Sequence, residues 1–402
     1  MSLIKTNLMS EDKKLNVLFL PAWYPNPDNP IAGKFVIGHA MAILEEVSQL
    51  SVFYVHPYKN ASRLFKQEVF TKDEINHLII THKRFDGLLF PVSMLLYMFS
   101  LFYGYAKAVK LFGKPDINHV HVLTRVGLLA LVMKYIYNIP YVITEHWSRY
   151  LPTVNNYHGL IRKKLTSLIA QKSSGISAVS ENLLMALKSH NIVNEKSMVI
   201  RNTIDTDFYK PKAKNETTRF KFLHVSGLED KVKNVSGILN AVKELKRSKS
   251  DFELHIIGDY ADRKIFEGFT REHHLNNVFF YGELYGEELL EHYQGADAFV
   301  LFSNYENLPC VLLEAICVGM PIISSQVGGT GEIVNVNNGI LVKPKDEKAL
   351  AIAMQAIIST YHQYNSALIR QQAIEKYAYN SVGKQLLTFY RLAITNNYHR
   401  IK

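Results

Sequence analysis

The sequence predicts an α/β protein with two doubly wound parallel-sheet domains, and three observations lead to this prediction. Short apolar runs bounded by turn residues alternate with helix-like stretches, which is typical of parallel strands joined by crossover helices. This alternation stops at a polar, charged stretch and then restarts. The chain of 402 residues is also too long for one typical hydrophobic core and suits two.

The first half of the chain supplies five expected strands and five expected helices. The strands are expected at residues 15–20, 51–55, 118–122, 141–144 and 175–179. The helices are expected at residues 35–49, 94–111, 127–137, 161–171 and 181–189. Residues 1–201 are therefore interpreted as an N-terminal domain, with a loose polar tail ahead of its first strand.

The second half repeats the pattern after a connection at residues 202–219. Strands are expected at residues 220–225, 253–257, 278–281, 298–302, 321–324 and 339–342, and helices at 236–247, 286–293, 308–318 and 347–361. Residues 220–375 form the expected C-terminal domain, and residues 376–402 form a helical segment expected to pack back on the N-terminal domain. Ligands of such sheets bind at the carboxyl ends of the strands, so we expect the site in a cleft between the domains.

Charge and cysteine content narrow the partners and the compartment. A net charge of +10 favours an anionic partner, such as a phosphorylated substrate or an acidic membrane surface. No nucleic-acid-binding signature occurs, so nucleic acid is not expected as a partner. Cys310 and Cys317 have neither metal-ligand spacing nor a disulfide framework, and residues 1–14 lack the apolar core of a signal peptide. These features predict a cytoplasmic protein.

Residues 87–112 are the most apolar segment, and two interpretations of them stay open. Ser93, Ser100, Lys107 and Lys110 interrupt the segment, so no transmembrane helix is expected. It is either a core helix packed on the first sheet or a helix in a membrane interface, with its terminal lysines directed toward anionic headgroups. The second interpretation predicts peripheral association with the inner face of the cell membrane.

Residues 302–318 carry the most informative pattern for chemistry. A strand ends, a loop presents Glu306, and a helix begins near Pro309 and contains Glu314. The free N–H groups of a helix start suit a diphosphate, and paired carboxylates suit sugar hydroxyls. A solvated loop glutamate and an ordinary helix charge remain the structural alternative.

Several segments together resemble glycosyltransferase family 4, whose members are retaining transferases of the GT-B fold. Besides Glu306, Glu314 and the pair Gly328-Gly329, the matching segments follow one another in the expected order. They are WYPNPDNPIAGKF (23–35), IPYVITEHWS (139–148), AVSENL (178–183), IRNTIDTDFYKP (200–211), GADAFVLFS (295–303) and NNGILV (337–342). The resemblance covers nearly the whole chain. It implies two Rossmann-like domains facing across a cleft, with the acceptor on the N-terminal side and the donor on the C-terminal side.

The resemblance implies roles for the charged residues on the donor side. Glu314 matches a glutamate that contacts the ribose hydroxyls of the nucleotide, and Glu306 matches one placed near the donor sugar. Lys233 matches the lysine that neutralises the donor diphosphate. Asn307, Leu308 and Pro309 stand where the family more commonly has a glycine-rich, donor-binding triplet. An arginine that the family often has after the first strand of the second domain is missing from His224-Val225-Ser226-Gly227-Leu228.

Three further residues are implied by the resemblance on or near the first domain. Gly33 matches a glycine that allows close backbone approach to donor and acceptor, His146 matches a histidine close to the transferred sugar, and Asn202 is placed among the donor-binding residues. Gly33 and His146 each also have a structural alternative, since Gly33 could be an ordinary turn glycine and His146 an ordinary histidine at the end of a strand. His119 and His121 are interpreted as packing residues.

No metal and no cofactor are expected. Asp205-Thr206-Asp207 invites a metal interpretation, which we reject because family members carry similar residues there without one. Lys233 and a helix start would then stabilise the leaving diphosphate, with Lys231, Arg201 or backbone groups in place of the missing arginine.

The sequence thus predicts a retaining, metal-independent glycosyltransferase. It would move a sugar from a nucleotide-diphosphate sugar to a glycan or lipid-linked acceptor, the leading hypothesis being a surface-polysaccharide precursor. Two alternatives stay open, namely a nucleotide-sugar epimerase and a non-catalytic sugar-nucleotide-binding protein.

Overall fold

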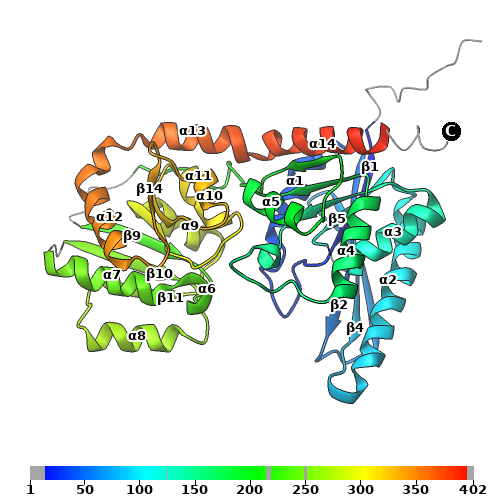
Figure 1. Cartoon of the computed structure of the whole chain (residues 1–402), viewed down its shortest axis with the longest axis horizontal. Helices are drawn as coiled ribbons and strands as arrows, with labels where there is room; N and C mark the ends of the chain where they lie inside the picture. Colours follow the sequence, from blue (N-terminus) through cyan, green and yellow to red (C-terminus); the bar gives the residue numbers. More distant parts are fainter. Residues whose placement is uncertain (1–13, 124, 214–218, 249–250, 396–402) are drawn as a thin grey trace, which may run out of the picture.

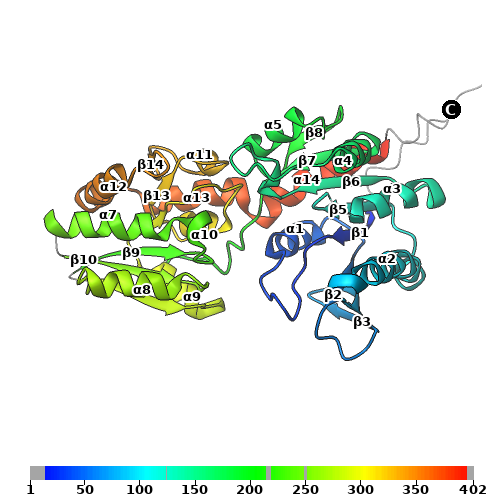
Figure 2. The ribbon, with the colours of Figure 1, turned by 60° about the horizontal axis from the view of Figure 1, so that its bottom comes forward.

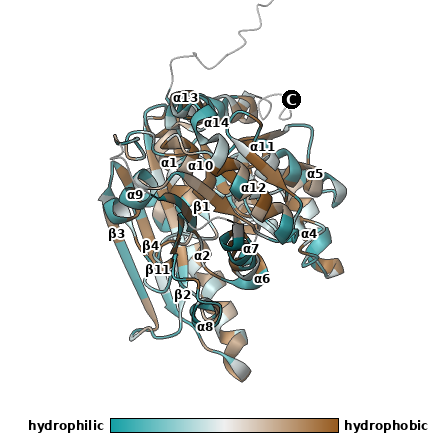
Figure 3. Cartoon of the chain, turned by 90° about the vertical axis from the view of Figure 1, so that its left-hand side faces the viewer, coloured by the Kyte–Doolittle hydropathy of each residue, from teal (hydrophilic) through white to brown (hydrophobic). Residues whose placement is uncertain are grey.

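The computed structural model describes residues 14–123, 125–213, 219–248 and 251–395, which form two sheets, each flanked by helices (Figure 1). The expected N-terminal tail lies almost entirely outside the described residues, as does part of the connection at 202–219. Hydrophobic residues concentrate on the strands, whereas the outer helices α6 (Asp230–Lys233), α7 (Val235–Ser248) and α8 (Arg263–Glu272) are largely hydrophilic (Figure 3).

The first sheet has eight strands in the order β3-β4-β2-β1-β5-β6-β7-β8. Its strands are β1 (Asn16–Pro21), β2 (Gln49–Tyr58), β3 (Phe65–Lys72), β4 (Ile75–Lys83), β5 (Ile117–His121), β6 (Tyr141–Glu145), β7 (Gly175–Ala178) and β8 (Ser197–Val199). Its helices are α1 (Lys34–Leu44), α2 (Phe90–Phe112), α3 (Arg125–Tyr137), α4 (Leu160–Lys172) and α5 (Glu181–Ser189). Short single turns occur at Gly87–Leu89 and Ser148–Tyr150.

The second sheet has six parallel strands in the order β11-β10-β9-β12-β13-β14. Its strands are β9 (Phe220–Val225), β10 (Phe252–Ile257), β11 (Val278–Gly282), β12 (Ala298–Leu301), β13 (Ile322–Ser325) and β14 (Gly339–Val342). Its helices are α6 (Asp230–Lys233), α7 (Val235–Ser248), α8 (Arg263–Glu272), α9 (Gly286–Gly295), α10 (Cys310–Cys317), α11 (Thr330–Ile333) and α12 (Glu347–Thr360), followed by a turn at Tyr361–Gln363.

Both sheets reverse their winding direction beside a central strand. The reversal falls between β1 and β5 in the first sheet and between β9 and β12 in the second. Loops on either side of such a point diverge and leave room for a ligand at the carboxyl ends of the strands. The prediction of two doubly wound α/β domains is therefore confirmed.

The last two helices connect the two halves (Figure 1 and Figure 2). Helix α13 (Ser366–Tyr377) packs on α10, and α14 (Tyr379–Thr395) packs on α1 of the first half. The contact with α1 is close, since a Cβ atom at Gly383 would lie 2.0 Å from the carbonyl oxygen of Ala42. Helix α14 therefore packs against the N-terminal half of the molecule.

The sequence analysis missed the hairpin formed by β3 and β4. These strands pair antiparallel, so the first sheet is mixed at one edge rather than wholly parallel. Their turn residues Asp73 and Glu74 both have positive φ, at 51° and 60°. Such turns usually carry Asn-Gly or Asp-Gly, and the absence of that signal explains the miss. Strand β8 and helices α6 and α8 were also missed.

Helix α2 covers one face of the first sheet but leaves much of its own surface open. It packs on β2 and β4 through a strip of residues that includes Ser100, Leu101 and Tyr105. By length and composition, the segment Gly87–Phe112 is apolar enough to cross a membrane, which the sequence analysis did not expect. Only 22% of its most apolar window is buried in the protein. Helix α2 therefore has one side packed on the sheet and another side that is apolar and exposed.

Candidate active site

Lys233 and Glu306 meet at the carboxyl edge of the second sheet. Lys233 ends α6, which follows β9, and Glu306 follows β12, so the two come from the loops that flank the reversal point. Lys233 Nζ lies 2.6 Å from Glu306 Oε1, which also accepts a 2.7 Å hydrogen bond from the Ser303 hydroxyl. An ammonium has three donors, so Lys233 can hold Glu306 and a further anionic oxygen together.

Two glycines fix the backbone of the Glu306 loop. Gly328 has a φ of 54°, and a Cβ atom there would lie 1.8 Å from the carbonyl oxygen of Glu306. The N–H of Gly329 donates to the carbonyl of Asn307 at 2.7 Å. The pair Gly328-Gly329 therefore serves close packing against the loop that presents Glu306, because any side chain at Gly328 would displace that loop.

Glu314 lies in the second turn of α10, with its carboxylate surrounded by protein. The hydroxyl of Tyr293 donates to Glu314 Oε2 at 2.6 Å. Burial raises the pKa of this carboxyl group, while hydrogen bonds from Tyr293 and Tyr209 and the charge of Lys34 oppose the rise. Glu314 is thus held in one orientation beside the start of α10, whose first N–H groups have no partner within the helix.

The triplet Asn307-Leu308-Pro309 joins the two halves of the molecule. Asn307 Nδ2 donates to the carbonyl of His146 at 2.8 Å, and its Oδ1 accepts from the Ser180 hydroxyl at 2.9 Å. Asn202 Nδ2 donates to the carbonyl of Leu308 at 3.0 Å. Four of the predicted donor-side and sugar-side positions are therefore brought together, and their roles stay predictions.

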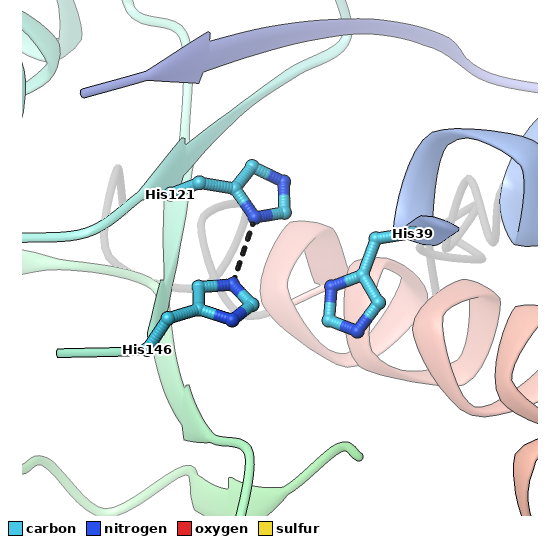
Figure 4. A group of neighbouring side chains, drawn as sticks. All are labelled: His39, His121 and His146. Atoms are coloured by element: carbon cyan, nitrogen blue, oxygen red, sulfur yellow. Dashed lines mark hydrogen bonds between the residues drawn. The ribbon is translucent and has the colours of Figure 1, made fainter. Parts of the chain in front are cut away.

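Three buried histidines form the N-terminal side of the site (Figure 4). His39 lies on α1, His121 ends β5 and His146 follows β6. His121 Nδ1 and His146 Nε2 share a hydrogen bond of 3.2 Å, and His39 Nε2 bonds to the carbonyl of Arg201 at 2.8 Å. One nitrogen from each ring lies within 4.8 Å of the others, which is close enough to consider a metal. Two of these rings already bond to each other, in the His121–His146 pair. The absence of a metal stays a prediction.

The surroundings keep these imidazoles neutral. Burial lowers the pKa of His39 to about 4, and it lowers the pKa values of His121 and His146 well below the usual value. Neighbouring imidazoles lower the latter two further. His119 is also buried, but it is more than the packing residue that we expected, because it bonds to Tyr390 of α14 at 2.6 Å and to Thr144 at 2.7 Å.

Glu145 is a buried group that the sequence analysis missed. Its carboxylate accepts hydrogen bonds from the backbone N–H groups of Leu123, His146 and Trp147, at 2.9, 2.8 and 2.8 Å. Burial raises its pKa to about 7, although these three donors oppose the rise. Glu145 thereby fixes the turn that carries His146.

Gly33 directly precedes α1 with a φ of 65°, and a Cβ atom there would lie 2.3 Å from the carbonyl oxygen of Trp23. The turn itself therefore requires glycine, which favours a purely structural role for Gly33. Close approach of its backbone to a ligand remains a prediction.

Arg201 pairs with Glu332 at 3.4 Å and so already has an acidic partner. Asp205 Oδ1 accepts the N–H groups of Asp207 and Phe208 in a local turn.

Comparison with known proteins identifies the family. Residues 60–208 match the model "Glycosyltransferase Family 4", and residues 205–380 match "Glycosyl transferases group 1". The chain belongs to glycosyltransferase family 4. The chain is 29% identical over 256 residues to the glycogen synthase of Mycobacterium tuberculosis, and the match covers 61% of the chain and 60% of the length of that relative.

Solved structures share the fold of this chain over almost its full length. Sucrose-phosphate synthase from Thermosynechococcus elongatus matches with a TM-score of 0.75 at 18% identity, covering 95% of this chain and 100% of that one. Anabaena HepE in complex with UDP matches with a TM-score of 0.71 at 16% identity, covering 93% and 99%. At these identities the likeness establishes the GT-B architecture, which confirms the expected fold.

Proposed function

We propose that this glycosyltransferase moves a sugar from a nucleoside-diphosphate sugar to an acceptor, with retention of configuration and without a metal. The observation that carries the proposal is the Lys233–Glu306 pair at the reversal point of the second sheet, whose charged atoms lie 2.6 Å apart. The fold relative HepE was solved with UDP, which supports a nucleoside-diphosphate donor.

Each group in the site suits one part of this reaction. Negative charge develops on the leaving diphosphate, and Lys233 with the start of α10 would stabilise it. Glu314 would accept hydrogen bonds from ribose hydroxyls, since a carboxylate has about four acceptor positions and Tyr293 and Tyr209 fill only part of them. His146, kept neutral by burial, would bond a sugar hydroxyl without adding a charge beside the breaking bond.

A donor screen with chelator tests this proposal. Purified protein is mixed with UDP-, GDP- and ADP-sugars in excess EDTA, and both thermal stabilisation and donor consumption are followed. We expect one nucleotide class to stabilise the protein and to be consumed slowly. A strict requirement for added divalent metal, or no response to any donor, would contradict the proposal, and rapid interconversion of donor sugars without acceptor would favour an epimerase.

We further propose that the acceptor is lipid-linked and that the protein works at the inner face of a membrane. The exposed side of α2 carries large apolar residues, with exposed fractions of 70% at Leu95 and 58% at Phe99. Lys110 and Lys114 lie exposed at the other end of this helix. An apolar helix face beside cations suits an anionic lipid surface.

Vesicle binding tests this part separately. We expect sedimentation with vesicles containing phosphatidylglycerol, weaker binding to neutral vesicles, and loss of binding in a Leu95→Ser, Phe99→Ser double variant. Met185→Ser on α5, where the side chain is 60% exposed, serves as the matched control. Equal binding by both variants would remove α2 as the membrane contact.

A further inference from the structure

Lys34 reaches across the domain boundary toward the donor side. It is the first residue of α1, directly after the Gly33 turn, and its ammonium lies 5.4 Å from the centroid of the Tyr285 ring. Tyr285 belongs to the second domain, where it follows β11 and precedes α9. Its hydroxyl donates to Glu283 at 2.7 Å, which fixes the ring under the ammonium.

The charge of Lys34 has no acidic partner among the residues that the structure describes. Its side chain is exposed, and no carboxylate of the described chain lies within ion-pair distance. Burial raises the pKa of Glu314 and brings that of Cys310 to about 12, and the charge of Lys34 opposes both rises. The charge of Lys34 therefore acts on two residues of α10, the helix at whose start the donor is proposed to bind.

The loop after β9 carries no cation in its first residues, Ser226-Gly227-Leu228. Lys233, on the same connection, is already engaged with Glu306. A diphosphate at the start of α10 would thus have Lys233 as a cation from its own domain, and Lys34 is the candidate for a second cation from the opposite domain.

We propose that Lys34 is a binding residue for the donor diphosphate, supplied by the N-terminal domain in place of a second cation from the C-terminal domain. This inference rests on the proposed function. An exposed cation on an aromatic ring gains less free energy than a hydrogen bond between charged groups. The ammonium would thus leave Tyr285 for a phosphate oxygen, and the bound donor would link the two domains.

Calorimetric titration with nucleotides and nucleosides tests the assignment. UDP, GDP and ADP are titrated into the wild type to find the nucleotide that binds, and the matching nucleoside is then titrated as a phosphate-free reference. For Lys34→Met we expect affinity for the diphosphate to fall about tenfold and affinity for the nucleoside to stay within about twofold. Lys34→Arg should retain most of the diphosphate affinity.

The control variant is Lys264→Met, which removes an exposed lysine from α8 on the same protein. Unchanged diphosphate affinity in Lys34→Met would overturn the inference while leaving the proposed function in place. Equal losses for the diphosphate and the nucleoside would also overturn it, since Lys34 would then support the base or the local fold. If the wild type binds no nucleoside diphosphate, both this inference and the proposed function fail.

Discussion

The two halves of the candidate site differ in charge, because one presents charged side chains and the other presents neutral histidines. The C-terminal half presents charged groups with partial access to solvent, with exposed fractions of 21% for the Lys233 side chain and 10% for Glu306. The N-terminal half presents His39, His121 and His146, which burial keeps neutral. A diphosphate needs positive charge, whereas a sugar needs hydrogen-bonding groups that do not disturb the charge developing at its anomeric carbon. We therefore propose that the C-terminal half supplies most contacts to the donor phosphates, with Lys34 as an addition from the N-terminal half, and that the neutral histidines lie beside the sugar.

The largest effect expected from this comparison follows the loss of Lys233. Lys233→Met removes the cation nearest the leaving group, so kcat should fall by about 10²–10³-fold, the range found when one transition-state donor is lost. Lys233→Arg keeps the charge and should recover part of the activity. Steady-state kinetics with a single donor would measure this, and a fall confined to KM would show that Lys233 does not act in the transition state.

Acid destabilisation should come mainly from the neutral half. The pKa of His39 is about 4 in the folded protein and about 6.5 in the unfolded chain. The unfolded chain therefore takes up the proton first, and stability falls as pH drops from about 6.5 toward 4. His39 alone should cost about 2 kcal/mol between pH 7 and pH 5.

Urea unfolding at these two pH values measures the effect. His39→Asn should be less stable than the wild type at pH 7 but should lose less stability on going to pH 5. An equal loss in both proteins would show that His39 is not protected from protonation.

A smaller effect is expected on the donor side at Glu314. Glu314→Gln removes the negative charge but keeps an acceptor for Tyr293, so donor KM should rise about tenfold while kcat changes little, because the ribose is remote from the breaking bond. Glu287→Gln, an exposed change on α9, is the control. A dominant loss in kcat would place Glu314 in the chemistry instead.

The smallest effect concerns the bridge between the halves. Asn307→Ala removes hydrogen bonds to His146 and Ser180, and turnover should fall roughly threefold to fivefold, in line with net hydrogen-bond energies of about 0.5–1.5 kcal/mol. Asn304→Ala removes a bond to Lys231 within the second domain and should change turnover less. If both variants behave alike, the bridge has no special role.

The fold was predictable because buried parallel strands appear as continuous apolar runs. The runs at Phe220–Val225 and Gly339–Val342 coincide with β9 and β14. The β3–β4 hairpin was not predictable, because Asp73-Glu74 lacks the usual turn glycine. Exposed residues on β3 also hide the apolar pattern of an edge strand.

The candidate site was predictable only within each half. Glu306 and Lys233 follow neighbouring strands, so parallel topology brings them to one edge. Contacts between the halves depend on how the domains face one another, which local sequence patterns do not encode. Asn307 and His146 are 161 residues apart, and the Lys34–Tyr285 contact likewise joins different domains.

The most direct test of this division of roles is the affinity for a free nucleoside diphosphate in wild type, Lys233→Met and His146→Asn. With the nucleotide that the wild type binds, calorimetry in EDTA should show about tenfold weaker binding for Lys233→Met and a change below about twofold for His146→Asn. Both variants should nevertheless lose turnover with the intact donor. Weakened binding in His146→Asn together with unchanged binding in Lys233→Met would contradict the account.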